Sequence, residues 1–117
     1  MTIPTSGYIK ISATGKLEII DAATVTDTTR FINQTVEGWF DVVRTDGPID
    51  FWLNDEGIYT HSVNPVATEI IRTWLGTTTQ MFYGPVLIAR HDNEGETLPL
   101  TPEDMEHIIS VHGEVSD

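Results

Sequence analysis

The sequence predicts an α+β fold, in which a mostly antiparallel sheet of about five or six strands carries two or three packed helices. Segments of alternating apolar and polar residues, which are typical of strands, are interspersed with segments whose apolar residues recur at helical spacing. Turn signals rich in Gly, Pro, Asp and Asn arrive every 10 to 15 residues. The length of 117 residues suits a single domain spanning 1–117 with one core.

Two hairpins are predicted in the sheet. Residues 8–13 and 16–20 alternate apolar and polar side chains around Thr14–Gly15, which predicts an antiparallel pair of strands. Residues 39–45 and 49–54 are rich in β-branched and aromatic side chains, and the Asp-Gly-Pro sequence between them is typical of a turn.

A first helix is predicted at about 25–36. Thr24 and Asp27 have the spacing of a capping box, apolar residues then recur at helical intervals, and Gly38 supplies a stop. The short segment 58–61 follows a turn and is predicted to be a third strand or a loop.

Two further helices have clear start signals. Asn64–Pro65 is typical of an N-cap followed by the first helical residue, and this helix should end at Gly76. Thr101–Pro102 is a second start of the same kind, with acidic residues in the first turn and Gly113 beyond the end. Between these helices, 81–90 is predicted to be a buried strand whose Gly-Pro pair marks a bulge or a sheet edge, and a turn at 92–96 leads to Leu98 and Leu100.

The charge of the chain restricts its function. Six Lys and Arg residues stand against 18 Asp and Glu residues, which gives a formal net charge of −12 and disfavours direct nucleic-acid binding. The last 27 residues contain eight acidic residues and no Lys or Arg. An acidic surface that includes Glu103, Asp104 and Glu106 is a candidate binding surface for a basic partner.

Several classes of protein and of site are disfavoured. Cysteine is absent, so disulfides and thiolate chemistry are excluded. No apolar run approaches a membrane span, and the N-terminus lacks a signal-peptide pattern, so we expect a soluble protein that stays inside the cell that makes it, without membrane contact. His107 and His112 are five residues apart and do not share a helical face, and no other ligand spacing indicates a metal or a cofactor.

The polar residues of segment 52–71 allow two interpretations. Asn54, Glu56, His61 and Asn64 are either turn and cap residues or a converging group of ligands or catalysts. Their spacing alone does not demand the second interpretation.

Four motifs follow one another over about residues 38–111: a Trp-x-Asn-x-Glu-Gly stretch, an Asn-Pro-x-Ala helix start, a Tyr-Gly-Pro-Val strand and a Leu-Thr-x-Glu-Asp helix start. In these motifs the sequence resembles the family of domains of unknown function called DUF3846. Members occur in tailed phages, especially those of actinobacteria, and in mobile elements, so the resemblance implies a setting in an infected bacterial cell. The matching residues are Trp52, Asn54, Glu56, Gly57, Asn64, Pro65, Ala67, Tyr83, Gly84, Pro85, Val86, Leu100, Thr101, Glu103 and Asp104.

Adjacent aromatic residues in the second hairpin must point to opposite faces of the sheet. One member of the pair Trp39 and Phe40, and one of Phe51 and Trp52, should therefore lie away from the main core. If helices cover only one face, an exposed aromatic patch with Trp39 or Trp52 results, and such patches mark contact sites. A helix or a second subunit covering that face is the alternative.

The function predicted from these features is that of a non-enzymatic phage accessory protein. It would bind and modulate a host protein, such as a nucleic-acid-binding one, through the acidic C-terminal surface and the aromatic patch. An exposed strand edge or aromatic face would also permit a homodimer.

Two alternatives remain open at the sequence level. One is a binder of a nucleotide-like signal between the second helix and the sheet, where Trp52 or Trp74 would stack on a base and Asn54, Asn64 or Arg72 would hold polar atoms. The other is a hydrolase that uses His61 with Glu56 or Asp55.

Overall fold

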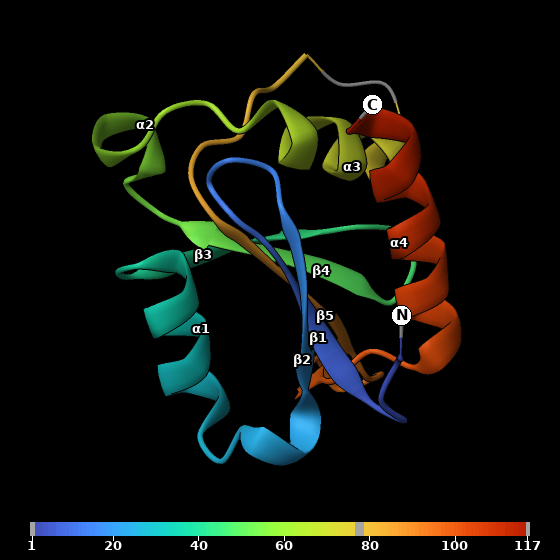
Figure 1. Cartoon of the computed structure of the whole chain (residues 1–117). Helices are drawn as coiled ribbons and strands as arrows, with labels where there is room; N and C mark the ends of the chain where they lie inside the picture. The colour runs from blue at the N-terminus through green and yellow to red at the C-terminus, as the bar shows by residue number, and fades with distance from the viewer. Residues whose placement is uncertain (1, 77–78, 117) are drawn as a thin grey trace.

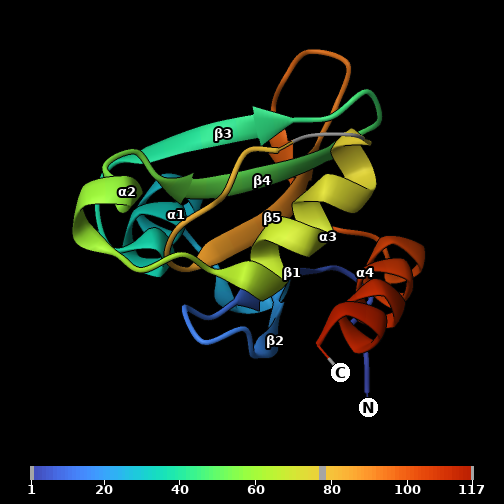
Figure 2. The same ribbon diagram turned by 90° about the horizontal axis from the view of Figure 1, so that it is seen from above.

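The computed structural model describes residues 2–76 and 79–116 and confirms the α+β class. A six-stranded sheet in which every paired strand is antiparallel forms the centre, and helices lie on both of its faces (Figures 1 and 2). The strand order is β2-β1-β5-β4-β3, and β6 pairs with the end of β5. The strands are β1 Gly7–Ile11, β2 Leu17–Asp21, β3 Phe40–Arg44, β4 Ile49–Asn54, β5 Val86–His91 and β6 Thr97–Leu98.

The helices form two layers, one on each face of the sheet. The helix α1 packs on one face, while α3 and α4 pack on the other. Among the described residues, no helix is both long and apolar enough to cross a membrane. The helices are α1 Thr28–Val36, α2 Gly57–Thr60, α3 Pro65–Leu75 and α4 Pro102–Val115, with a short 3-10 helix, η1, at Ala22–Thr24.

The alternation of side chains along the strands divides the core into two clusters. Phe51 and Ile88 lie in the larger cluster, against α3 and α4, whereas Trp52 and Leu87 lie in the smaller cluster, against α1. Tyr8 belongs to the α1 side, where burial raises the pKa of its phenol and a hydrogen bond with Thr28 opposes that shift. Both faces of the central strands are therefore covered.

The first helix starts three residues later than the sequence predicts. Thr24 lies in η1, and its hydroxyl donates to the carbonyl of Asp21. Asp27 is the true N-cap of α1, since its carboxylate accepts from the backbone N–H of Arg30. The predicted capping box is wrong because the 3-10 turn uses Thr24.

Three other boundaries differ from the prediction. Segment 58–61 is neither a strand nor a loop, because Gly57–Thr60 forms the single helical turn α2. The strand predicted at 81–90 begins only at Val86 and is central in the sheet, while Tyr83 forms an isolated bridge with Val63. Helix α4 continues through Gly113 to Val115, because Val115 still packs against the larger core cluster and the backbone N–H of Ser116 closes the last turn on the carbonyl of His112.

The cap of α4 gives a direct test of local stabilisation. Thr101 accepts from the backbone N–H of Asp104, whose carboxylate accepts from the backbone N–H of Thr101, so both halves of a capping box are present. We expect Thr101→Ala to lower the free energy of unfolding by about 1 kcal/mol, measured by urea denaturation.

Thr26→Ala is the matched control for that test. Thr26 is exposed and lies just outside a helix, and its hydroxyl forms no hydrogen bond in the described part of the chain. An equal loss of stability in the two variants would contradict the assigned role of the Thr101 cap.

Candidate functional site

Asn54 connects the end of β4 to the end of α1. Its side-chain amide donates to the carbonyls of Val36 and Glu37, at 3.1 and 3.2 Å, and its side-chain oxygen accepts from the backbone N–H of Glu56. Asn54 therefore closes the last turn of α1 and starts the turn into α2. Glu56 itself is exposed and has no side-chain cap hydrogen bond to α2.

Asn64 is completely buried and joins three parts of the chain. Its amide donates to the carbonyls of Ser12 and Gly84, at 2.9 and 2.8 Å. Its side-chain oxygen accepts from the backbone N–H of Ala67, so it is also the N-cap of α3. The side chain of Asn64 therefore has a structural role, because it connects these three parts of the chain, and its complete burial makes it inaccessible to a ligand.

His61 pairs with a carboxylate that the sequence did not indicate. Its Nε2 atom lies 2.8 Å from Oε1 of Glu37, and its Nδ1 atom lies 2.8 Å from the hydroxyl of Thr60. The exposed carboxylates of Glu56 and Asp55 are not its partners in the described structure. The ring also packs closely on Gly84, where an added Cβ would lie 2.8 Å from Cγ of His61 and where φ is +77°.

Most of the polar cluster in segment 52–71 is therefore structural. Asn54 and Asn64 each hydrogen-bond to backbone groups of other segments, as turn and cap residues do. His61 instead pairs with the side chains of Glu37 and Thr60. The Gly-Pro pair before β5 belongs to the same junction, because the carbonyl of Gly84 accepts from Asn64. The hydrolase alternative expected His61 to pair with Glu56 or Asp55, whereas in the structure His61 pairs with Glu37.

The tryptophans predicted to bind lie in three different environments. Trp52 is only 8% exposed and packs edge-on against Phe40 on the face of the sheet that α1 covers. Trp74 is half-buried on the opposite face, between Phe51 and His107. The two rings therefore lie on opposite faces of the sheet, and only Trp74 lies on the face that carries α3. The face that Trp52 would have exposed is covered by α1.

Trp39 remains exposed and lies beside α2. Its side chain is 77% exposed, and its carbonyl accepts from the backbone N–H of Asp55. Ile58 and Tyr59 in α2 are 61% and 85% exposed. We call the surface formed by residues 37–41 and 54–59 the α2 end, and Figures 1 and 2 both place α2 beside the start of β3.

The α2 end is acidic as well as apolar. Glu37, Asp41, Asp55 and Glu56 are all exposed, and neither of its two segments contains Lys or Arg. The sequence analysis identified Trp39 as a candidate binding residue. It did not predict the acidic surface around Trp39, because it placed the acidic binding surface in the C-terminal third of the chain. Exposed large apolar side chains within one negatively charged surface are typical of contact sites.

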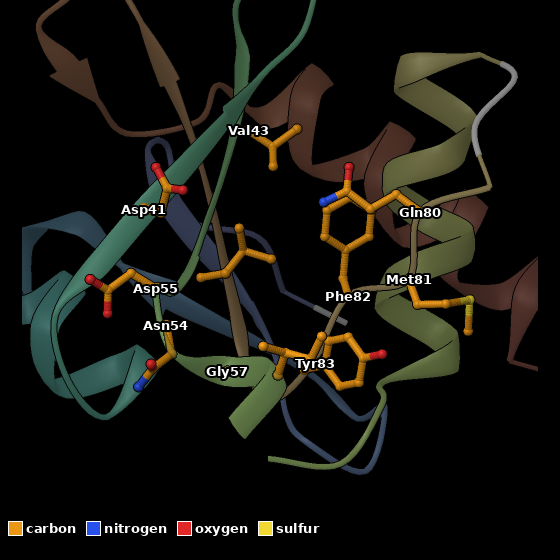
Figure 3. A pocket seen from close by; sticks show the side chains of 11 residues that line it. Asp41, Val43, Asn54, Asp55, Gly57, Gln80, Met81, Phe82 and Tyr83 are labelled. Atoms are coloured by element: carbon orange, nitrogen blue, oxygen red, sulfur yellow. The ribbon is translucent and has the colours of Figure 1, made fainter. Parts of the chain in front are cut away.

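A pocket of about 410 Å³ opens next to the α2 end. Leu53 and Phe82 supply buried apolar surface, and Asp41 and Asp55 supply carboxylates. Figure 3 shows the two carboxylates on one side of the pocket, with Gln80, Phe82 and Tyr83 across from them. Neither carboxylate forms an ion pair within the described structure, so both can meet a ligand. The complete lining is Asp41, Val43, Leu53, Asn54, Asp55, Gly57, Ile58, Gln80, Met81, Phe82 and Tyr83.

The acidic residues predicted in α4 are far from this pocket. Helices α2 and α4 lie on opposite sides of the molecule in both views (Figures 1 and 2). Glu103 and Glu106 are exposed, whereas Asp104 is half-buried in the capping box and forms an ion pair with Arg90 at 3.2 Å. Asp104 thus has a structural role, and Glu103 and Glu106 form a separate acidic surface.

Metal binding has no support in the described part of the chain. No group of three or more His, Asp or Glu side chains there is arranged to hold a metal ion. His107 packs on Trp74, and Nε2 of His112 lies 2.8 Å from the carbonyl of Gly15, so these two histidines serve packing and contact roles.

The fold and the site together define a small α+β domain with an acid-lined pocket beside exposed aromatic side chains. The chain belongs to the family described as Domain of unknown function (DUF3846), whose model matches residues 9–112. The match extends beyond the 38–111 range of the resemblance and includes most of the first hairpin. No curated protein and no solved structure is detectably similar to the chain.

Proposed function

We propose that this protein is a non-enzymatic accessory protein that binds a basic segment of another protein at the α2 end. The observation that carries this proposal is the exposure of Trp39, Ile58 and Tyr59 within a surface of four acidic side chains. Aromatic anchors in interface centres supply much of the binding free energy, and opposite charge raises the association rate. The partner is expected to present lysine or arginine beside apolar side chains.

The neighbouring pocket is suited to a single long basic side chain. Its apolar lining would contact the aliphatic stem of a lysine or arginine, and Asp41 and Asp55 would pair with the cationic head. Phosphate groups would be repelled by the same carboxylates, which weighs against the nucleotide-like ligand considered from the sequence. A small organic cation is the alternative occupant, since the volume suits a small ligand.

The setting that we propose is the cytoplasm of a bacterial cell infected by a phage or carrying a mobile element. The partner would be a host protein with a basic surface, such as one that binds nucleic acid, and binding would block that surface. The net charge of −12 supports this proposal because it favours long-range attraction to basic proteins.

Two matched double variants distinguish the two acidic surfaces. We expect Asp41→Asn with Asp55→Asn to slow association with the proposed basic partner about fivefold, because the charge next to the aromatic anchor is lost. The control, Glu103→Gln with Glu106→Gln, removes the same charge from α4 and should have a smaller effect. Association rates are measured by surface plasmon resonance at low and high salt.

The reverse order of the two double variants would contradict the location of the site. It would instead support the C-terminal acidic surface that the sequence predicts. A partner that is a small molecule rather than a protein would appear as a thermal shift with organic amines that Asp41→Asn abolishes.

A further inference from the structure

A second hollow, of about 670 Å³, lies between the β3–β4 turn and the β5–β6 turn. Figure 2 shows both turns projecting from the same side of the molecule, and α2 lies at the other end of the β3–β4 hairpin. Arg44, Asp46, His91, Asp92 and Glu94 are among the residues that line this hollow. None of them belongs to the α2 end, so the site is independent of the function proposed above.

A fully buried carboxylate lies directly behind the hollow. The side chain of Asp50 is 0% exposed, and its Oδ1 atom lies 2.8 Å from Nδ1 of His91 and 3.9 Å from Nε of Arg44. Its Oδ2 atom has no hydrogen-bond partner in the described structure. Burying a carboxylate that is only partly paired is energetically unfavourable, and the paired position on β5 is occupied by Ala89, so an apolar residue at position 50 would suit the fold better.

Asp50 fixes the orientation of His91. In the neutral imidazole, the Nδ1–H group donates to Asp50, and Nε2 then carries a free lone pair. Nε2 forms no hydrogen bond within the described residues, and His91 lines the hollow with its side chain 21% exposed. The backbone N–H of His91 also donates to the carbonyl of Pro48, which holds β5 against the opposite turn. A buried carboxylate thus orients a histidine that lines the hollow, and the Nε2 atom of this histidine is available as an acceptor.

We propose that this hollow binds an ammonium or guanidinium group, which donates a hydrogen bond to Nε2 of His91. The bound cation, His91 and Asp50 would form a chain of hydrogen bonds in which each bond polarises the next. The charges around Nε2 of His91 favour a cation as the ligand. The lining of the hollow contains three acidic side chains, Asp46, Asp92 and Glu94, and one basic side chain, Arg44. Asp50 adds a negative charge behind the imidazole ring of His91.

The test is an NMR titration of the whole chain with butylguanidinium chloride. Butylurea, which has a similar shape and no charge, and potassium chloride at equal ionic strength are the matched ligand controls. We expect butylguanidinium to shift the Nε2 signal of His91 and the amides of residues 44–48 and 91–95 with an affinity in the millimolar range. Neither control should reproduce this set of shifts.

The protein variants test the acceptor itself. His91→Asn retains a donor near the position of Nδ1 for Asp50 and removes Nε2, so we expect a loss of affinity of about tenfold or more. Asp50→Asn should weaken binding through the loss of the charge behind His91, and His107→Asn on α4 is the control that should bind normally. Melting temperatures confirm that each variant is folded.

Three results would overturn this inference. The first is an unchanged affinity of His91→Asn for butylguanidinium. The second is that potassium chloride causes NMR shifts of the same size as butylguanidinium does. The third is that the Nε2 signal of His91 does not shift up to the solubility limit of butylguanidinium. The last two results need only the wild-type protein, so the inference stays falsifiable if the variants do not fold.

Discussion

Replacing Asn64 by alanine should lower the free energy of unfolding by about 3 to 4 kcal/mol, a large effect for a single polar side chain. The variant leaves the carbonyls of Ser12 and Gly84 without their donor and removes the N-cap of α3. Because Asn64 is completely buried, water cannot replace these hydrogen bonds without entering the core. Urea denaturation followed by far-ultraviolet circular dichroism measures the loss.

Asn93→Ala is the control for this prediction. Asn93 is exposed in the turn between β5 and β6, so its substitution should change stability by less than about 0.5 kcal/mol. If Asn64→Ala were as stable as Asn93→Ala, Asn64 would not be the structural centre of the junction, and a ligand-binding role for it would regain support.

Replacing Trp39 by alanine should weaken binding to the partner about 30-fold, which corresponds to about 2 kcal/mol. The indole is 77% exposed in the free protein, so truncation removes contact area in the complex and leaves the core unchanged. The melting temperature should therefore stay close to that of the wild type, while the dissociation constant rises. Calorimetric titration and thermal denaturation of the same samples measure the two quantities.

The matched control for Trp39 is Leu98→Ala. Leu98 is an exposed apolar residue in β6, and β6 pairs with the end of β5 that lies away from α2. We expect little change in affinity for this variant. Equal weakening by the two substitutions would contradict a specific aromatic anchor at the α2 end.

The elements that the sequence predicts correctly are those with local chemical signals. Asn64–Pro65 and Thr101–Pro102 start helices because their cap hydrogen bonds join residues only three positions apart. Helix α2 was not predicted because a single turn has too few residues for a periodic signal. Its start depends on Asn54, which is held by the end of α1.

The candidate sites were harder to predict because their parts meet only through the sheet. Asp50 and His91 are 41 residues apart and come together because β4 pairs with β5. The only sequence signal was an aspartate inside the otherwise apolar and aromatic run 49–53, where a charge is unexpected. The burial of Trp52 by α1 could not be predicted either, since no local sequence pattern indicates which face of the sheet α1 will occupy.

The acidic surfaces illustrate the same limit. The charge count of the sequence favoured the C-terminal third as the acidic surface, because the acidic residues are dense in sequence there. The four acidic side chains of the α2 end come from two segments that β3 and β4 bring together. Their density is visible only in the folded chain.

Site-specific photo-cross-linking in an actinobacterial lysate tests whether the α2 end is the surface that binds the partner. A photoreactive phenylalanine derivative is placed at position 59, replacing the exposed Tyr59 of α2, and in a second sample at position 106, replacing the exposed Glu106 of α4. We expect one basic host protein to cross-link through position 59 and not through position 106, with less product at high salt. Cross-linking through position 106 alone, or no protein at either position, would contradict binding at the α2 end.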